Sequence, residues 1–196
     1  MPNVRARWAL LASYVALIYA SLPFGPWVGL RLLRTGVGSW LLGPGVAVIV
    51  VVGAVVLAIV LRRRQAPPWA YAAVVVAAAG YGLAFSTLRA QRLERTHLPE
   101  YGLVAWLAWR ALDPRGRGEP RTYAAAAALA AAIGLGDELL QAVVPGRYYD
   151  IRDVAMNAVG ALLGTLVISA VRAGDARHKA AVPRRNAEIV SPRQAG

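Results

Sequence analysis

The chain has 196 residues, of which 58% are hydrophobic and 16% are charged, and it contains no cysteine. Soluble domains carry about 25% charged residues, so this composition excludes a disordered polyelectrolyte and favours a protein whose apolar segments lie in a bilayer. The formal net charge of +12 is divided among short clusters between apolar runs. Such clusters are typical of the basic residues that orient membrane spans, and they do not indicate a nucleic-acid partner.

Three spans are predicted in the N-terminal part of the chain. Residues 8–22 form an apolar run behind Arg5 and Arg7. This run also resembles a secretory signal peptide, whose cleavage would remove one span. Residues 40–61 contain no charged residue, and at about 1.5 Å per residue they cross the roughly 30 Å hydrocarbon core. Residues 69–88 form the third run.

Three further spans follow, at residues 98–112, 122–144 and 154–171. Pro99 is compatible with a helix only near its start, so the fourth helix is expected to begin around Thr96. The sequence therefore predicts an all-α protein, a polytopic transmembrane helix bundle of about six spans.

The chain is divided by this pattern into three parts. Residues 1–88 form an N-terminal transmembrane region of three spans, and residues 89–172 form a core of three more. Residues 173–196 are rich in polar and charged side chains and are predicted to be a disordered cytoplasmic tail.

The basic residues predict the orientation. With the N-terminus inside, 15 of the 22 Lys and Arg residues fall on the inner side. The positive-inside rule then predicts a multi-pass membrane protein with both termini cytoplasmic. Two polar clusters, at 94–101 and 138–153, consequently lie on the outer face.

Polar side chains concentrate in these two clusters. Glu94, His97 and Glu100 are spaced three apart, and Tyr101 follows His97 by four residues. This spacing places the four on one face wherever the segment is helical. At helical rise, Glu138 lies about 10 Å below the outer end of its span. A carboxylate at that depth needs a partner, and His97 and Arg147 are candidates.

Two interpretations of the clusters remain open. The polar groups either tie helices together by buried hydrogen bonds and ion pairs or converge on a functional site. The candidate ligand-binding residues are Glu94, His97, Glu100, Tyr101, Glu138, Gln141, Arg147, Asp150, Asp153 and Asn157. Catalytic roles are considered for His97, Glu138 and Arg147. His97 and several carboxylates could hold a divalent ion, but no metal and no cofactor is expected, because one histidine in reach and no cysteine would be unusual for zinc.

Two glycines with the spacing of a helix-packing motif lie inside the last predicted span. Gly160 and Gly164 are four residues apart, and small residues at this spacing allow two helix backbones to approach closely in lipid. These glycines are therefore expected to serve packing.

Two segments, 94–103 and 136–164, resemble the VanZ-like family of small bacterial membrane proteins. The second contains Glu-x-x-Gln, Pro-x-Arg, Asp-x-x-Asp and Asn-x-x-Gly-x-x-x-Gly in the family's order and spacing. The similarity covers residues 94–170. The first two predicted spans and the tail contain no recognised motif of the family, and the resemblance says least about residues 1–88. By position, the resemblance implies functional roles for Glu94, His97, Tyr101, Glu138, Gln141, Arg147, Asp150, Asp153 and Asn157.

The resemblance implies an envelope protein of the bacterial plasma membrane, and the founding member of the family is tied to reduced susceptibility to the glycopeptide teicoplanin. We expect an outer-leaflet pocket for an anionic lipid, a lipid-linked cell-wall precursor or a glycopeptide-like amphiphile, with membrane lipids as partners. An intramembrane enzyme acting on a lipid-linked or phosphorylated substrate is the first alternative, with His97 as acid or base and Arg147 as a phosphate clamp. A small transporter or flippase is the second.

Overall fold

A computed structural model describes residues 3–41, 44–87 and 96–190, with the backbone alone for residues 41, 87 and 177–190. These residues form helices and no strand, which confirms the predicted all-α class. The helices are α1 (Val4–Ser21), α2 (Gly25–Leu33), α3 (Gly36–Leu41), α4 (Pro44–Arg63), α5 (Pro68–Thr87), α6 (His97–Leu112), α7 (Pro120–Gln141) and α8 (Ile151–Val190). Proline opens α4, α5 and α7, where its missing N–H costs no helical hydrogen bond.

Four helices are long and apolar enough to cross a membrane: α4, α5, α7 and the Ile151–Ala176 part of α8. The pair α1 and α2 makes a fifth candidate, bent by 74° at residues 22–24. The predicted number of about six spans is therefore loose, since four to five candidates are found among the described residues. The remaining predicted span is α6, which has only 16 residues, fewer than the roughly 20 that a span needs.

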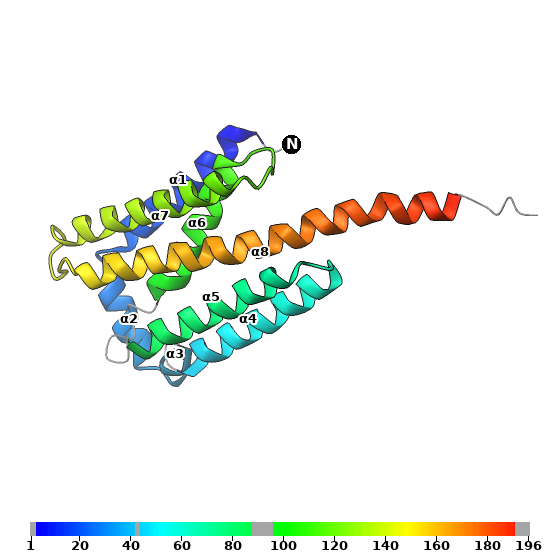
Figure 1. Cartoon of the computed structure of the whole chain (residues 1–196). Helices are drawn as coiled ribbons and strands as arrows, with labels where there is room; N and C mark the ends of the chain where they lie inside the picture. Colours follow the sequence, from blue (N-terminus) through cyan, green and yellow to red (C-terminus); the bar gives the residue numbers. More distant parts are fainter. Residues whose placement is uncertain (1–2, 42–43, 88–95, 191–196) are drawn as a thin grey trace, which may run out of the picture.

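Helix α6 is enclosed by the rest of the bundle. It packs against α1, α7 and α8, and nine of its 16 residues are buried. The hairpin α4–α5 packs against the opposite side of α8, so α8 separates this hairpin from α1 and α7 (Figure 1). Because protein encloses α6, this helix can carry the polar His97 and can be shorter than a helix that faces lipid.

The two predicted packing glycines lie where α8 crosses α6. A Cβ on Gly160 would lie 2.5 Å from the carbonyl oxygen of Leu98, and one on Gly164 would lie 2.6 Å from Cα of Gly102. Both distances are shorter than any real contact, so the two backbones meet directly and the predicted role of these glycines is confirmed.

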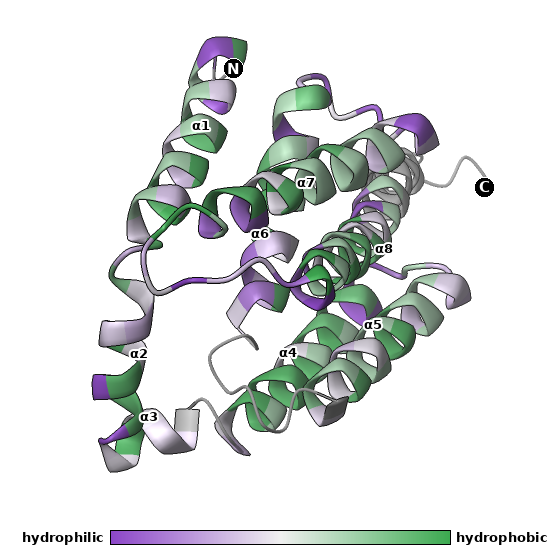
Figure 2. Ribbon diagram, turned by 90° about the vertical axis from the view of Figure 1, so that its left-hand side faces the viewer, coloured by the Kyte–Doolittle hydropathy of each residue, from purple (hydrophilic) through white to green (hydrophobic). Residues whose placement is uncertain are grey.

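Helix α4 presents an apolar face to the surroundings of the bundle. Its exposed side chains include Val48, Ile49, Val52 and Ile59, with Ile49 60% exposed. Figure 2 shows α4 and α5 coloured as largely hydrophobic. Such a continuous face is expected where a helix contacts lipid.

Basic residues connect helix ends at the end of the bundle opposite to His97. Arg7 Nη1 donates to the carbonyl oxygen of Arg110 at 2.8 Å, and Arg172 Nη2 donates to that of Gly116 at 2.9 Å. Arg64 pairs with Asp175. The predicted inner segments therefore do meet at one end of the bundle. That this end faces the cytoplasm stays a prediction.

The C-terminal segment differs from the predicted disordered tail, because α8 continues as a helix to Val190. Alanine, arginine and lysine are strong helix formers and are frequent in residues 173–190. Asp175 also anchors this helix to Arg64. The last six residues of the predicted tail, 191–196, lie outside the described residues.

Candidate functional site

A cavity of about 610 Å³ lies where α1 meets α2, α6 begins, α7 ends and α8 begins. Its polar wall includes His97, Glu100, Asp137, Arg147 and Asp153. Its other wall is the bend between α1 and α2. The apolar side chains of that wall are Ile18, Leu22, Phe24, Val28 and Leu32. A cavity with one polar and one apolar wall suits a ligand of the same double character.

The last turns of α7 direct three polar side chains into the bundle. Asp137 and Glu138 are fully buried, and Gln141 is 1% exposed. The helix ends after Gln141, and the chain turns at Gly146, whose φ of 79° is in the left-handed region that glycine adopts readily. This turn brings Arg147 back over the last turn of α7.

Arg147, Gln141 and Glu138 form a chain of hydrogen bonds. Arg147 donates from Nε, at 2.9 Å, and from Nη2 to the side-chain oxygen of Gln141. Gln141 Nε2 donates to Glu138 Oε1 at 2.8 Å. The backbone N–H of Asp150 donates to Glu138 Oε2 at 3.2 Å. Both oxygens of the buried carboxylate are thus satisfied, as burial requires.

His97, the first residue of α6, faces two carboxyl groups. Its Nδ1 lies 3.7 Å from Glu100 Oε2 and 3.9 Å from Asp137 Oδ2. The ring is stacked at 6.3 Å, between ring centroids, on the fully buried Tyr101 one turn later. These contacts confirm the expected helical face formed by His97, Glu100 and Tyr101.

The first turns of α8 supply Asp153 and Asn157. Asp153 is 5% exposed and lies at the cavity wall. Asn157 is deeper, where its Nδ2 donates to the carbonyl oxygen of Gly134 at 3.2 Å. A Cβ on Gly134 would lie 2.6 Å from Cβ of Asn157, which is too close for two carbon atoms. The absence of a side chain at Gly134 therefore lets α7 and α8 approach closely at this point.

Three residues are close enough to hold a metal ion. His97, Glu138 and Asp153 each offer one donor atom, and these atoms lie within 4.8 Å of one another. Two buried atoms in this group, His97 Nδ1 and Asp153 Oδ1, have no hydrogen-bond partner among the described residues.

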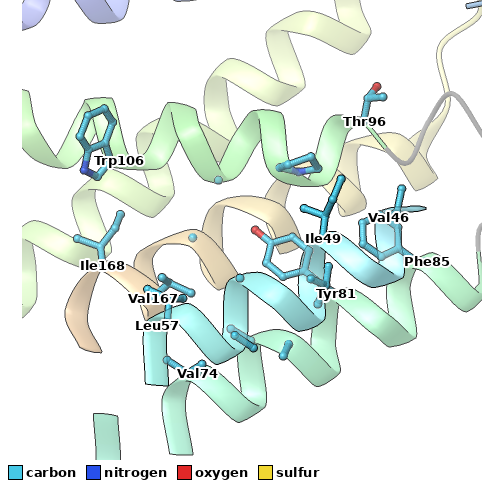
Figure 3. A pocket seen from close by; sticks show the side chains of 18 residues that line it. Val46, Ile49, Leu57, Val74, Tyr81, Phe85, Thr96, Trp106, Val167 and Ile168 are labelled. Atoms are coloured by element: carbon cyan, nitrogen blue, oxygen red, sulfur yellow. The ribbon is translucent and has the colours of Figure 1, made fainter. Parts of the chain in front are cut away.

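A second cavity, of about 580 Å³, lies between α4, α5, α6 and α8. Its lining is almost entirely apolar and includes Val46, Ile49, Phe85 and Trp106. Figure 3 shows Thr96 near one end of the lining residues and Trp106 near the other. Thr96 also lines the polar cavity, so the two cavities adjoin at the start of α6.

Most of the predicted site residues are brought together by the structure. His97, Glu100, Gln141, Arg147, Asp150 and Asp153 line the polar cavity, and Tyr101, Glu138 and Asn157 lie buried behind it. Glu94 lies outside the described residues. Asp137 was missing from the predicted site, although its position four residues before Gln141 placed it on the same helical face. The apolar wall of α1 and α2 was also missed, because apolar side chains in a span carry no distinguishing pattern.

A family model described as VanZ/LLP1 matches residues 12–172 of the chain. The match begins within α1, so the likeness extends well beyond residues 94–170, where the motifs lie. No curated protein and no solved structure matches the chain.

Proposed function

The chain belongs to the VanZ/LLP1 family, and from this premise we propose that it binds an amphiphilic molecule of the bacterial cell envelope. The anionic head group occupies the polar cavity, and the hydrocarbon chain lies in the apolar cavity. The membrane-spanning helices support the location of such a ligand within the bilayer.

The observation that carries this proposal is that Thr96 lines both cavities. An amphiphile has two parts that require different surroundings, and a polar and an apolar cavity that adjoin provide both. The apolar cavity is bordered by Ile49, which is 60% exposed on the lipid-facing helix α4. A hydrocarbon chain can therefore enter from the bilayer without crossing the packed core.

The presence of Arg147 in the polar cavity favours a ligand with an anionic head group. Arg147 is the only Lys or Arg among the described residues that line the polar cavity, and guanidinium groups bind phosphate or carboxylate oxygens in pairs. The ligand class is thus an anionic lipid, a lipid-linked cell-wall precursor or a glycopeptide-like amphiphile. Through the last of these, we propose, the protein lowers susceptibility to teicoplanin.

Binding of a fluorescent polyprenyl phosphate to the purified protein in nanodiscs tests this function. Gly53 lines the apolar cavity, and a Cβ there would meet no atom within 4 Å. Gly53→Leu should fill the cavity and weaken binding about tenfold or more. The matched control is Gly82→Leu, because Gly82 also has open space around it but does not line the cavity.

The head group is tested in the same assay. Arg147→Gln should weaken binding of polyprenyl phosphate, Arg147→Lys should retain part of it, and neither should change binding of an uncharged polyprenol. Equal binding by wild type, Gly53→Leu and Arg147→Gln would refute the proposal. In cells, wild type but not Gly53→Leu should raise the inhibitory concentration of teicoplanin.

A second candidate function is an intramembrane enzyme acting on a lipid-linked or phosphorylated envelope substrate. The observation favouring it is the buried His97, with Glu100 and Asp137 within 4 Å of its Nδ1. This arrangement provides a general acid or base beside Arg147, which can hold a phosphate. Turnover of the bound polyprenyl phosphate that depends on His97 would favour the enzyme over the binding protein.

A further inference from the structure

We propose that His97, Glu138 and Asp153 bind a divalent transition-metal ion, of the kind represented by Zn²⁺ and Mn²⁺. This site goes beyond the binding of an amphiphile and does not depend on it. It departs from the expectation of no metal, which considered the number of histidines and the absence of cysteine but not which side chains the fold brings together.

The three donors come from three different helices. His97 is the first residue of α6, Glu138 lies in the last turn of α7, and Asp153 lies in the first turn of α8. Their donor atoms lie within 4.8 Å of one another. Ligand atoms around one ion with bonds of about 2.0 to 2.2 Å are about 3 to 4 Å apart, so small side-chain rotations close the site.

Burial and hydrogen bonding support a cation at this position. The exposed fractions of His97, Glu138 and Asp153 are 9%, 0% and 5%. Buried polar atoms normally have hydrogen-bond partners, yet Asp153 Oδ1 has none within the described parts of the chain. His97 Nδ1 has none either, since the nearest carboxyl oxygens lie 3.7 and 3.9 Å away. A bound ion supplies a partner to Asp153 and orients the imidazole.

Glu138 can serve as a ligand while keeping its hydrogen bonds. Each of its oxygens accepts one bond, from Gln141 Nε2 or from the backbone of Asp150. A carboxylate has about four acceptor positions, so one remains for a metal. Such outer hydrogen bonds fix the orientation of metal ligands. The carboxyl groups of Glu100 and Asp137 flank the imidazole of His97 at 3.7 and 3.9 Å from Nδ1, which is beyond hydrogen-bond distance.

The charge around the site also favours a cation. Five carboxyl groups of the described residues converge here, against the single guanidinium of Arg147. They belong to Glu100, Asp137, Glu138, Asp150 and Asp153. Carboxylates gathered in a water-poor region repel one another, and a divalent ion offsets this repulsion.

The chemistry of the three ligands determines which ions fit the site. Their position in the fold determines where the unfilled coordination position points. Imidazole suits Zn²⁺, and carboxylates suit both Zn²⁺ and Mn²⁺. Three protein ligands leave at least one coordination position open. Since His97 and Asp153 line the polar cavity, that position faces the cavity, where water or an oxygen of an anionic head group completes the coordination.

Metal binding to the purified full-length protein in detergent, without added lipid, tests the site. After treatment with a chelator, the protein is dialysed against Zn²⁺ or Mn²⁺, and the retained metal is measured by mass spectrometry. Wild type should retain one ion per chain. His97→Ala and Asp153→Asn should bind at least about tenfold more weakly, whereas His178→Ala and Glu119→Gln, which remove the same groups elsewhere, should bind as wild type does.

A measurement on the wild-type protein removes the dependence on how the variants fold. Diethyl pyrocarbonate modifies histidine, and peptide mass spectrometry separates His97 from His178, the two histidines of the chain. Zn²⁺ should protect His97 and leave His178 unchanged. Equal modification of His97 with and without metal, or retention of metal by folded His97→Ala, would overturn the proposal. Failure of amphiphile binding leaves both results standing, since no lipid is present.

Discussion

Glu138 and Arg147 are connected through the side-chain amide of Gln141, which donates to the carboxylate and accepts from the guanidinium. The order of donors and acceptors in this series of hydrogen bonds is fixed. Arginine can only donate and a carboxylate can only accept, so Gln141 has one possible orientation. The carboxylate also accepts from the backbone of Asp150, and Glu138 therefore needs two acceptor oxygens.

The substitution Glu138→Gln should consequently reduce stability as well as binding. A glutamine at this position has one oxygen for two donors, so its NH₂ group faces a donor of Gln141 or of Asp150. The expected cost is about 1 to 3 kcal/mol, typical of a buried unsatisfied polar group. Thermal unfolding in detergent measures it, and an unchanged melting temperature would contradict the two-acceptor requirement. Glu119→Gln is the matched control at an exposed pair.

Close packing at Gly160 predicts that a large side chain there lowers stability much more than Glu138→Gln does. Gly160→Leu places side-chain atoms against the backbone of Leu98 and should separate α6 from α8, at a cost of about 3 kcal/mol or more. The amount of folded protein extracted from membranes should fall sharply. Gly82→Leu, which adds the same side chain to open space on α5, should accumulate like wild type. Similar yields for the two variants would exclude this packing.

The attachment of α1 to the bundle depends partly on Tyr19. Its hydroxyl donates to the carbonyl oxygen of Ile133 on α7 at 2.8 Å. Tyr19→Phe should lower the free energy of unfolding by about 1 kcal/mol, the usual worth of one such bond. Tyr14→Phe on the same helix serves as the control. Denaturation followed by tryptophan fluorescence measures both variants, and equal effects would argue against a specific role of the Tyr19 bond.

The absence of cysteine makes the orientation directly testable. Arg115 and Tyr148 are both exposed and lie beyond opposite ends of α7. In intact cells, a membrane-impermeant maleimide should label Tyr148→Cys and not Arg115→Cys, because the positive-inside rule places Arg115 in the cytoplasm. Labelling of both after permeabilisation is the control. The reverse pattern would place the polar cavity on the cytoplasmic side.

The helices could be predicted from sequence wherever an apolar run is long. Residues 44–63 are an example, since an uncharged run ending in arginines has few other interpretations. Helix α2 could not be recognised, because Pro23 and Pro26 resemble the end of a span. The structure instead continues as a helix after a bend of 74°, which forms one wall of the polar cavity.

For the site, helical spacing predicted which side chains share a face, such as His97 with Glu100 and Tyr101. It could not predict which faces of different helices meet, because that depends on packing at positions such as Gly160 and Gly164. The donor cluster of His97, Glu138 and Asp153 joins residues up to 56 positions apart. Only the tertiary structure brings them within one coordination sphere.

The length of α6 has a consequence for the surrounding lipid. Its 16 residues extend for about 24 Å at helical rise, less than the roughly 30 Å of a typical hydrocarbon core. A helix of this length does not reach the head groups on both sides of such a bilayer, so at least one of its ends lies within the hydrocarbon region unless the bilayer thins around the protein. Hydrophobic mismatch of this kind depends on acyl-chain length. Under the proposed function, we expect a head group to reach the polar cavity, at the His97 end of α6, more easily in a thin bilayer than in a thick one.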